Sequence, residues 1–253
     1  MKVSLITPVY NDPRIERCLK SIHEQEGKFE LEHVIVDSNS TDQTVEILDA
    51  HRDDIDILIR EDDDGVYDAM NKGVRAATGD IIGILNSDDR YQNQTVLESV
   101  HRTMKETESR ACYGDLVYVG EDDSVVRYWE GGEYEPWKFY LGWMPPHPTF
   151  FVHRSVYEEI GYFNQQLSIA ADYEFMLRAL ALHDISVSYI NDVLVRMEIG
   201  GQSNESVASM VEAVSDMYEA WQYHGKMGRF VAPFLHPLEK VPQYFRKPPK
   251  DDV

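Results

Sequence analysis

The sequence is poor in cysteine, in cations and in long apolar runs, and each shortage excludes a class of protein. Cys18 and Cys112 are too few for a disulfide framework or a cysteine metal site. Lys and Arg number 24 against 45 Asp and Glu, a net charge of −21, so the basic face required by nucleic acid is missing. Apolar runs such as Ile81–Leu85 are far shorter than the roughly 20 residues of a membrane-spanning helix. With no basic-then-apolar leader at its start, we expect a cytoplasmic protein with no nucleic-acid partner.

The remaining composition is that of a folded domain. Hydrophobic residues make up 43% of the chain and charged residues 27%, which are globular values. A chain of 253 residues suits one large domain, or one domain with an appendage.

Strand-like and helix-like segments alternate over the first 90 residues. β-Branched runs bounded by turn residues predict buried parallel strands at Val3–Val9, His33–Asp37, Ile55–Arg60 and Asp80–Leu85. Helical spacing separates these runs, and Asp12 is the expected N-cap of the first helix. Short connections between alternating strands and helices predict right-handed crossovers and a doubly wound parallel sheet.

The pattern changes after about residue 110. Further strands are expected at Cys112–Val119, Ser124–Trp129, Thr149–His153, Ser186–Ile190 and Val193–Glu198. Helices are expected near Asp172 and on an apolar stripe made of Val207, Met210, Val211, Val214, Met217 and Trp221. Five of the eleven prolines lie from Pro233 onward, which predicts little regular structure there.

Polar residues follow the predicted strands where a parallel sheet binds its ligands. Asp88 and Asp89 come directly after an apolar strand, where two neighbouring carboxylates cost electrostatic energy unless a cation is present. Oxygen ligands of this kind suit Mg²⁺ or Mn²⁺, while a helix cap or a solvated turn is the alternative. No Gly-rich loop follows the first strand, which disfavours dinucleotide and Walker-type nucleotide binding.

Several of these segments together resemble family 2 glycosyltransferases of the GT-A fold. The segments are Thr7-Pro8-Val9-Tyr10-Asn11, Val36–Asp42, Asp68–Gly73, Asn86-Ser87-Asp88-Asp89, Ala171–Arg178 and Gly200-Gly201-Gln202-Ser203. The resemblance covers residues 1–205 in order. It implies a GT-A-like α/β domain with a mostly parallel central sheet flanked by helices, followed by a C-terminal helical extension over residues 206–253.

The resemblance also assigns roles to positions at the strand ends. Thr7, Pro8, Val9, Tyr10 and Asn11 would surround the base and ribose, Asp37 would bind the base, and Glu61, Asp63 and Asn71 would line the nucleotide pocket. Asp89 would be the main metal ligand and Asp88 would contact the metal or the ribose. The family often has Asp where this chain has Asn86, so ligation of Mn²⁺ or Mg²⁺ is expected to rest on Asp88 and Asp89.

Two further residues are assigned to the acceptor side. Asp172 is the expected catalytic base, although only the second carboxylate of the usual acidic pair is present; capping its helix is the alternative. His147, in Pro145-Pro146-His147-Pro148, lies where relatives carry a His facing the acceptor or diphosphate, and a solvated loop histidine is the alternative. Gly200-Gly201 fits a tight turn near the diphosphate, or a plain hairpin turn.

The resemblance implies transfer of one sugar, with inversion, from a UDP- or GDP-linked donor to a glycan or lipid-linked acceptor. A nucleotidyltransferase that makes nucleotide sugars is the alternative enzyme, and a catalytically inactive nucleotide- or sugar-binding module is the alternative from another class. The usual Gly-rich triphosphate loop of the first is missing, and Asp88, Asp89 and Asp172 argue against the second.

The C-terminal tail reverses the charge of the chain. From Lys226 to Lys250 it carries six cations and one acid, Glu239, interleaved with aromatic residues. This pattern suits peripheral contact with an anionic membrane. Packing of the tail on the catalytic domain is the alternative.

Overall fold

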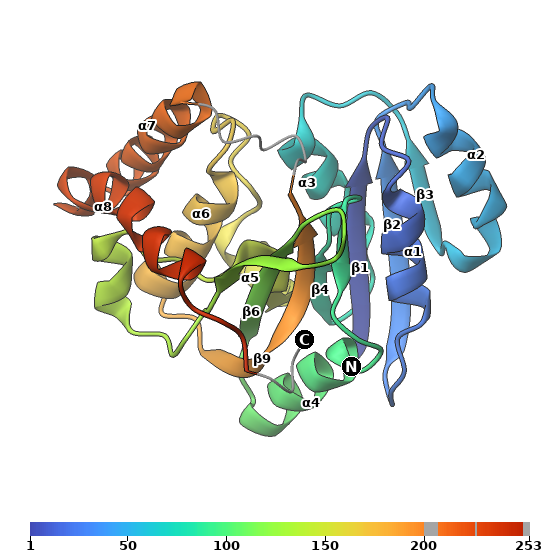
Figure 1. Cartoon of the computed structure of the whole chain (residues 1–253), viewed down its shortest axis with the longest axis horizontal. Coiled ribbons are helices and arrows are strands. Elements are labelled where there is room, and N and C mark those ends of the chain that lie inside the picture. Colours follow the sequence, from blue (N-terminus) through green and yellow to red (C-terminus); the bar gives the residue numbers. More distant parts are fainter. Residues whose placement is uncertain (200–206, 226, 250–253) are drawn as a thin grey trace.

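The computed structural model of the chain describes residues 1–199, 207–225 and 227–249 (Figure 1). Within these ranges no helix combines the length and the apolar character needed to cross a membrane. The glycines Gly200 and Gly201 lie outside the described residues.

A nine-stranded sheet runs through the described part of the chain. Its first half consists of β1 (Lys2–Val9), β2 (Glu30–Asp37), β3 (Ile57–Arg60) and β4 (Ile81–Ile84). These strands are parallel, as the alternating pattern predicts. Their order in the sheet is β3-β2-β1-β4. The strand order reverses between β1 and β4, which is where ligands bind in open α/β sheets.

Helices cover both faces of this parallel half. They are α1 (Ile15–His23), α2 (Gln43–Ala50), the 3₁₀ turn Arg52–Asp54 and α3 (Val66–Ala76). Side chains alternate along a strand, so Val9 and Ile35 pack with α1 and α2, whereas Ile6 and Val36 lie beneath α3. A Cβ on Gly73 of α3 would lie 2.3 Å from Ile6 Cγ2, so the absence of a side chain lets α3 lie close to β1.

The second half of the sheet is mixed. It contains β5 (Asp89–Tyr91), β6 (Ala111–Val119), β7 (Val125–Trp129), β8 (Phe151–His153) and β9 (Val187–Glu198). Strand β8 pairs antiparallel with β4 and β6, and β9 pairs parallel with β6. The predicted β6–β7 hairpin is confirmed. The two strands predicted over residues 186–198 are one strand, whose register against β6 shifts on both sides of Asp115.

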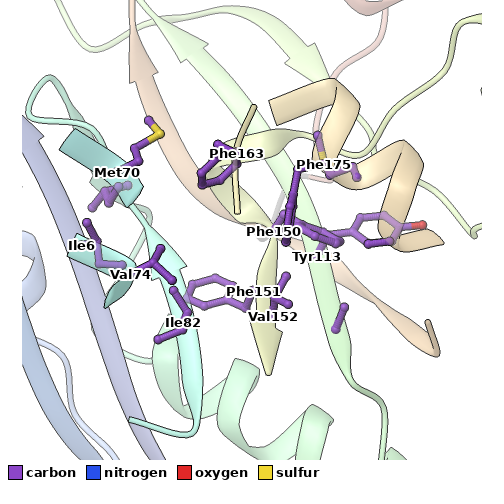
Figure 2. Packing of buried hydrophobic residues seen from close by; sticks show 14 of the residues in the cluster. Ile6, Met70, Val74, Ile82, Tyr113, Phe150, Phe151, Val152, Phe163 and Phe175 are labelled. Carbon is purple, nitrogen blue, oxygen red and sulfur yellow. The ribbon is translucent and has the colours of Figure 1, made fainter. Parts of the chain in front are cut away.

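The helices of this half include α4 (Val96–Thr107), α5 (Arg154–Ile160), α6 (Ala171–Met176) and the π-helix Leu177–Leu182 that continues α6. An aromatic cluster fixes α6 to its neighbours (Figure 2). The ring of Phe175 stacks on Tyr157 of α5 with centroids 4.5 Å apart, and it lies 5.1 Å from Phe163. The start of α6, which carries Asp172, is therefore held by a buried core.

The residues between β7 and β8 and those after residue 206 are more helical than predicted. Two short 3₁₀ helices, η2 (Pro136–Leu141) and η3 (His147–Thr149), lie between β7 and β8, where the sequence predicted no helix. Helix α7 (Val207–Tyr223) is confirmed, but Val211 on its predicted apolar stripe is 66% exposed. The tail predicted to be irregular forms η5 (Met227–Phe230), α8 (Ala232–Glu239) and η6 (Val241–Tyr244). Pro233 is tolerated because it stands in the first turn of α8, where its missing N–H has no helical partner.

Buried Glu32 ties three elements of the parallel half together. Its carboxylate accepts hydrogen bonds from Lys2 Nζ at 2.7 Å, from Ser4 Oγ at 2.5 Å, and from the backbone N–H of Thr78 at 2.7 Å. Burial raises the cost of the charged form, but these bonds outweigh it and lower the pKa of Glu32 to about 2. The charged form of Glu32 therefore stabilises the junction of β1, β2 and the end of α3.

We expect Glu32→Gln to remove a part of the acid sensitivity of the fold. A pKa lowered from 4.5 to about 2 contributes stability that is complete above pH 4.5 and is lost as the pH falls toward 2. For this shift the contribution is about 3 kcal/mol. Urea unfolding of both proteins between pH 7 and the acid limit measures it: the curves should converge as the pH falls. A constant gap at every pH would contradict the prediction.

Candidate active site

The polar segment that follows β1 and the polar segment that follows β4 lie at the same edge of the sheet. Leu85 N donates to Ile6 O at 3.0 Å, so the residues that follow each strand start side by side. Ser87 Oγ then donates to Asp12 Oδ2 at 2.8 Å, which joins the two segments directly. The predicted meeting of these strand ends is confirmed.

Asp89 is buried at the start of β5, and one of its oxygens has no partner. Its Oδ2 lies 3.3 Å from Asn86 Nδ2, while its Oδ1 has no hydrogen-bond partner. Burial, followed by the charge of Asp88, raises the pKa of Asp89 well above its usual range. Burial also raises the pKa of Asp88.

These two carboxylates fit a hard divalent cation. A buried carboxylate oxygen without a partner costs free energy that a cation would offset, and the neighbouring carboxylate supplies a second ligand of the same kind. Asp88 and Asp89 are therefore the residues able to hold Mn²⁺ or Mg²⁺. The amide of Asn86 contacts Asp89 and orients it.

Arg14 is a site residue that the sequence did not reveal. Its guanidinium binds Asp12 at 2.7 Å and lies 3.5 Å from Asp88 Oδ2, where its charge opposes the rise in the pKa of Asp88. Asp12 was predicted to cap α1, but that helix begins at Ile15 and Asp12 binds Arg14 instead. In the sequence, the one sign of this role was that Arg14 is a cation among the acidic residues that follow the predicted strands.

At the end of β2, Asp37 is buried and already paired. Its Oδ1 accepts from Ser40 N at 2.9 Å and its Oδ2 accepts from Arg60 Nε at 2.7 Å. Arg60, at the end of β3, was not predicted. A nucleotide base would therefore meet an aspartate whose position is fixed by two neighbours.

The segment after β1 is held against the loop after β2. Asn11 N donates to Ser40 Oγ at 2.9 Å, and Asn11 Oδ1 accepts from Thr41 N at 2.8 Å. Pro8 and Val9 are buried and Thr7 Oγ1 lies 3.1 Å from His33 Nε2, whereas Tyr10 is 53% exposed. Tyr10 and Asn11 thus present the accessible surface of this segment.

The other three predicted nucleotide residues have different positions. Glu61 is exposed and pairs with Lys72 at 3.1 Å. Asp63 accepts from the hydroxyl of Ser38, which places it beside the β2 end.

Asn71 is buried away from this surface. Its amide nitrogen and oxygen both bind the backbone of Phe163, each at 3.0 Å. A contact of Asn71 with nucleotide stays a prediction, and the structure gives it a role in holding the loop before α6.

Asp172 and His147 form a pair that faces Asn86, at the end of β4. Asp172 Oδ2 lies 3.3 Å from His147 Nδ1, and Asp172 Oδ1 lies 3.3 Å from the hydroxyl of Tyr67. The N-cap of α6 is Ala170, although Asp172 Oδ1 also accepts from Tyr173 N at 2.7 Å. The predicted base is therefore not the helix cap. Tyr67, on α3, was not predicted.

One pocket joins the two halves of the site. It is lined by Asn86 from the β4 end and by His147 and Asp172, with apolar neighbours that include Met70 and Phe163. The predicted base and Asn86, at the start of the segment that carries Asp88 and Asp89, therefore face a shared space.

Helix α7 fixes the backbone before Asp172. Asp216 Oδ2 accepts from Ile169 N at 2.8 Å and from Ala170 N at 3.3 Å. Next to the base, Tyr173 OH accepts from Trp221 Nε1 at 2.8 Å. Residues beyond position 205 thus help to position Asp172.

A larger groove lies next to Trp129, a neighbour of His147. Its volume is about 400 Å³, within the range of small-molecule sites. Trp129 lines the groove, and its ring contacts the ring of His147 at a centroid distance of 6.3 Å. Other lining residues come from two regions, residues 130–144 and residues 236–246.

Comparison with known proteins gives one consistent result. Residues 4–163 match the family described as Glycosyl transferase family 2. The chain is 33% identical over 211 residues to a PGL/p-HBAD biosynthesis glycosyltransferase of Mycobacterium bovis, covering 81% of this chain and 80% of that protein. It is 32% identical over 181 residues to an uncharacterized glycosyltransferase of Mycobacterium tuberculosis, covering 70% of this chain and 68% of that protein.

Solved structures show the same fold at lower identity. The mannosyltransferase PcManGT of Pyrobaculum calidifontis, in complex with GDP-Man and Mn²⁺, has a TM-score of 0.67 and 20% identity, covering 96% of this chain and 73% of its own. A fragment of S. aureus TarS in complex with UDP-GlcNAc has a TM-score of 0.66 and 22% identity, covering 88% of this chain and 65% of its own. The expected GT-A-like α/β fold is confirmed.

Proposed function

The chain belongs to glycosyl transferase family 2, and we propose that it moves one sugar, with inversion, from a nucleotide-diphosphate sugar to an acceptor hydroxyl. The acceptor is a glycan or a lipid-linked precursor, and the reaction takes place in the cytoplasm or at the inner face of its membrane. The observation that carries the proposal is the pocket shared by Asn86, His147 and Asp172, because it sets a carboxylate base opposite the start of the polar segment that follows β4.

The donor binds along the ends of β1, β2 and β4. Tyr10 and Asn11 contact the base and ribose from the accessible side, and Asp37, fixed by Arg60, hydrogen-bonds the base. Two complexes with this fold contain a UDP-linked and a GDP-linked sugar, and both bases are candidates for this chain.

Asp88 and Asp89 hold the divalent cation in this proposal. A bound Mn²⁺ or Mg²⁺ neutralises charge on the departing diphosphate. Mn²⁺ accompanies GDP-Man in the PcManGT complex, which supports a cation of this class.

Asp172 removes the proton from the acceptor hydroxyl as its oxygen attacks the anomeric carbon. His147 and Tyr67 hold the two carboxylate oxygens in position, each at 3.3 Å, and the remaining lone pairs of the carboxylate accept the proton of the substrate hydroxyl. Attack from the face opposite the nucleotide inverts the anomeric centre.

Incubation with UDP- and GDP-sugars and Mn²⁺ tests this function against its alternatives. We expect release of nucleoside diphosphate, slowly to water and faster with acceptor, and the release should stop in EDTA. Release of pyrophosphate from a sugar phosphate and nucleoside triphosphate would identify a nucleotidyltransferase. Binding of nucleotide with neither product would identify an inactive binding module.

A further inference from the structure

The C-terminal segment Ala232–Arg246 has two faces, and its inner face builds one wall of the groove beside His147. His236, Lys240 and Gln243 line the groove from this side. The contact is specific: Arg127 Nε donates to Gln243 Oε1 at 2.8 Å, and His236 Nδ1 lies 2.7 Å from Gly142 O. The packing alternative for the tail therefore holds for its inner face.

A glycine allows this close approach. Gly142, at the end of η2, has φ +89°, and a Cβ there would lie 2.5 Å from His236 N and 2.6 Å from Ala232 O. A side chain at this position would push α8 away from the groove.

The opposite wall of the groove is aromatic. It contains Trp129, Trp137 and Trp143, and the ring of Trp137 is 57% exposed. Flat aromatic rings with polar neighbours suit the apolar faces and hydroxyl groups of sugars. Through Trp129 and His147 this wall leads to Asp172, so a sugar in the groove would point toward the base.

The outer face of the same segment is a row of exposed apolar side chains. They are Phe230 (54% exposed), Phe234 (62%), Leu238 (62%), Val241 (52%) and Phe245 (83%). Phe230 ends η5, just before the segment, and the other four lie in α8, in η6 and directly after η6, at a spacing of three or four residues. An exposed apolar row of this length marks a binding surface.

The segment that carries this row is basic in an otherwise acidic protein. Residues 227–249 contain Arg229, Lys240, Arg246 and Lys247 against the single acid Glu239, in a chain of net charge −21. An anionic surface would attract this part of the chain and repel the rest.

We infer that the groove binds the glycan of a lipid-linked acceptor. The outer face of the segment docks on the anionic bilayer that contains this acceptor. The inference rests on the proposed function. The aromatic and apolar side chains enter the headgroup region, the cations contact anionic lipids, and a headgroup-linked sugar enters the groove within reach of Asp172. A bilayer is favoured over a protein partner because the row is rich in phenylalanine and belongs to a segment whose net charge is opposite to that of the rest of the chain.

Vesicle co-sedimentation of the full-length protein tests the docking step without any need for activity. The probe is phosphatidylcholine vesicles with and without phosphatidylglycerol. We expect binding to the anionic vesicles and a loss of about tenfold or more in the variant Phe234→Ser/Phe245→Ser. The control Val126→Ser removes a side chain that is 46% exposed on β7 and should bind like the wild type.

Transfer to lipid tests the acceptor step. With labelled donor and extracted membrane lipids, we expect label in the organic phase for the wild type, about tenfold less for Phe234→Ser/Phe245→Ser, and an equal rate of donor hydrolysis in water for both. Trp137→Ala should lower the transfer but not the vesicle binding.

Two results would overturn the inference: equal sedimentation of wild type and double variant, or a wild type that stays in solution and forms a dimer that the double variant does not form. If donor is not turned over at all, the proposed function fails, while the vesicle result still decides the docking step. Melting temperatures and nucleotide binding of each variant confirm that it is folded.

Discussion

Replacement of Asp172 by asparagine is expected to lower the rate of sugar transfer by about 10²–10⁴-fold, the usual contribution of a general base. The amide keeps the size of the carboxylate and can still accept from Tyr173 N and face His147, but it cannot take up the proton of the acceptor. Nucleotide binding in Mn²⁺ should be unchanged, because Asp172 lies on the acceptor side of the shared pocket. Single-turnover transfer and a nucleotide titration of the same sample measure both quantities.

The control Asp184→Asn makes the same chemical change just after the π-helix that continues α6, where Asp184 is exposed. Its transfer rate should match the wild type. If Asp172→Asn retains more than about a tenth of the wild-type rate, another group accepts the proton.

Replacement of Asp89 by asparagine is expected to abolish the advantage that Mn²⁺ gives to nucleotide binding, a loss of at least about 10–100-fold in affinity. The apoprotein should melt no lower than the wild type in EDTA, because burial and the charge of Asp88 make the ionised form of Asp89 costly. Since its pKa is raised, the wild type in EDTA should also gain stability as the pH falls below that pKa toward the ordinary value of 3.8, and the variant should lack this gain.

Asp80→Asn is the matched control, since Asp80 stands at the opposite end of β4 and is exposed. It should bind nucleotide like the wild type with Mn²⁺ and with EDTA. If Asp89→Asn loses affinity equally in both conditions, Asp89 contacts the nucleotide or supports the fold, and it is not the metal ligand.

The parallel half and its strand ends could be predicted because their signals are local. Each strand is a β-branched run that ends in polar residues, and parallel topology brings those ends together without knowledge of any single contact. Thus Asp88 and Asn11 were placed on the correct edge of the sheet.

The unpredicted site residues depend on contacts between distant segments. Tyr67 reaches Asp172 across 105 positions, and Arg60 reaches Asp37 from another strand. Nothing in the local pattern distinguishes these side chains from others on the same helix or strand. For the same reason the hydrogen bond of Asn71 to the Phe163 backbone was not predicted.

Local sequence patterns gave wrong predictions of secondary structure where contacts between distant segments decide it. Asn191 and Asp192 read as a turn between two strands, but the pairing of β9 with β6 absorbs them as a register shift. Prolines predicted an irregular tail, but Pro233 lies in the first turn of α8 and the packing of that helix against Gly142 keeps the turns in place.

Asp216 accepts hydrogen bonds from the backbone before Asp172, and this contact limits which segments of the enzyme can be exchanged with those of its relatives. A chimera joined between β9 and α7 would combine the Asp172 loop of one parent with the Asp216 of another, and the hydrogen bonds between them would be lost wherever the two parents differ. Exchange of donor or acceptor specificity by domain shuffling therefore requires that α6 and α7 come from the same parent, so that residues 169–221 are inherited as one block.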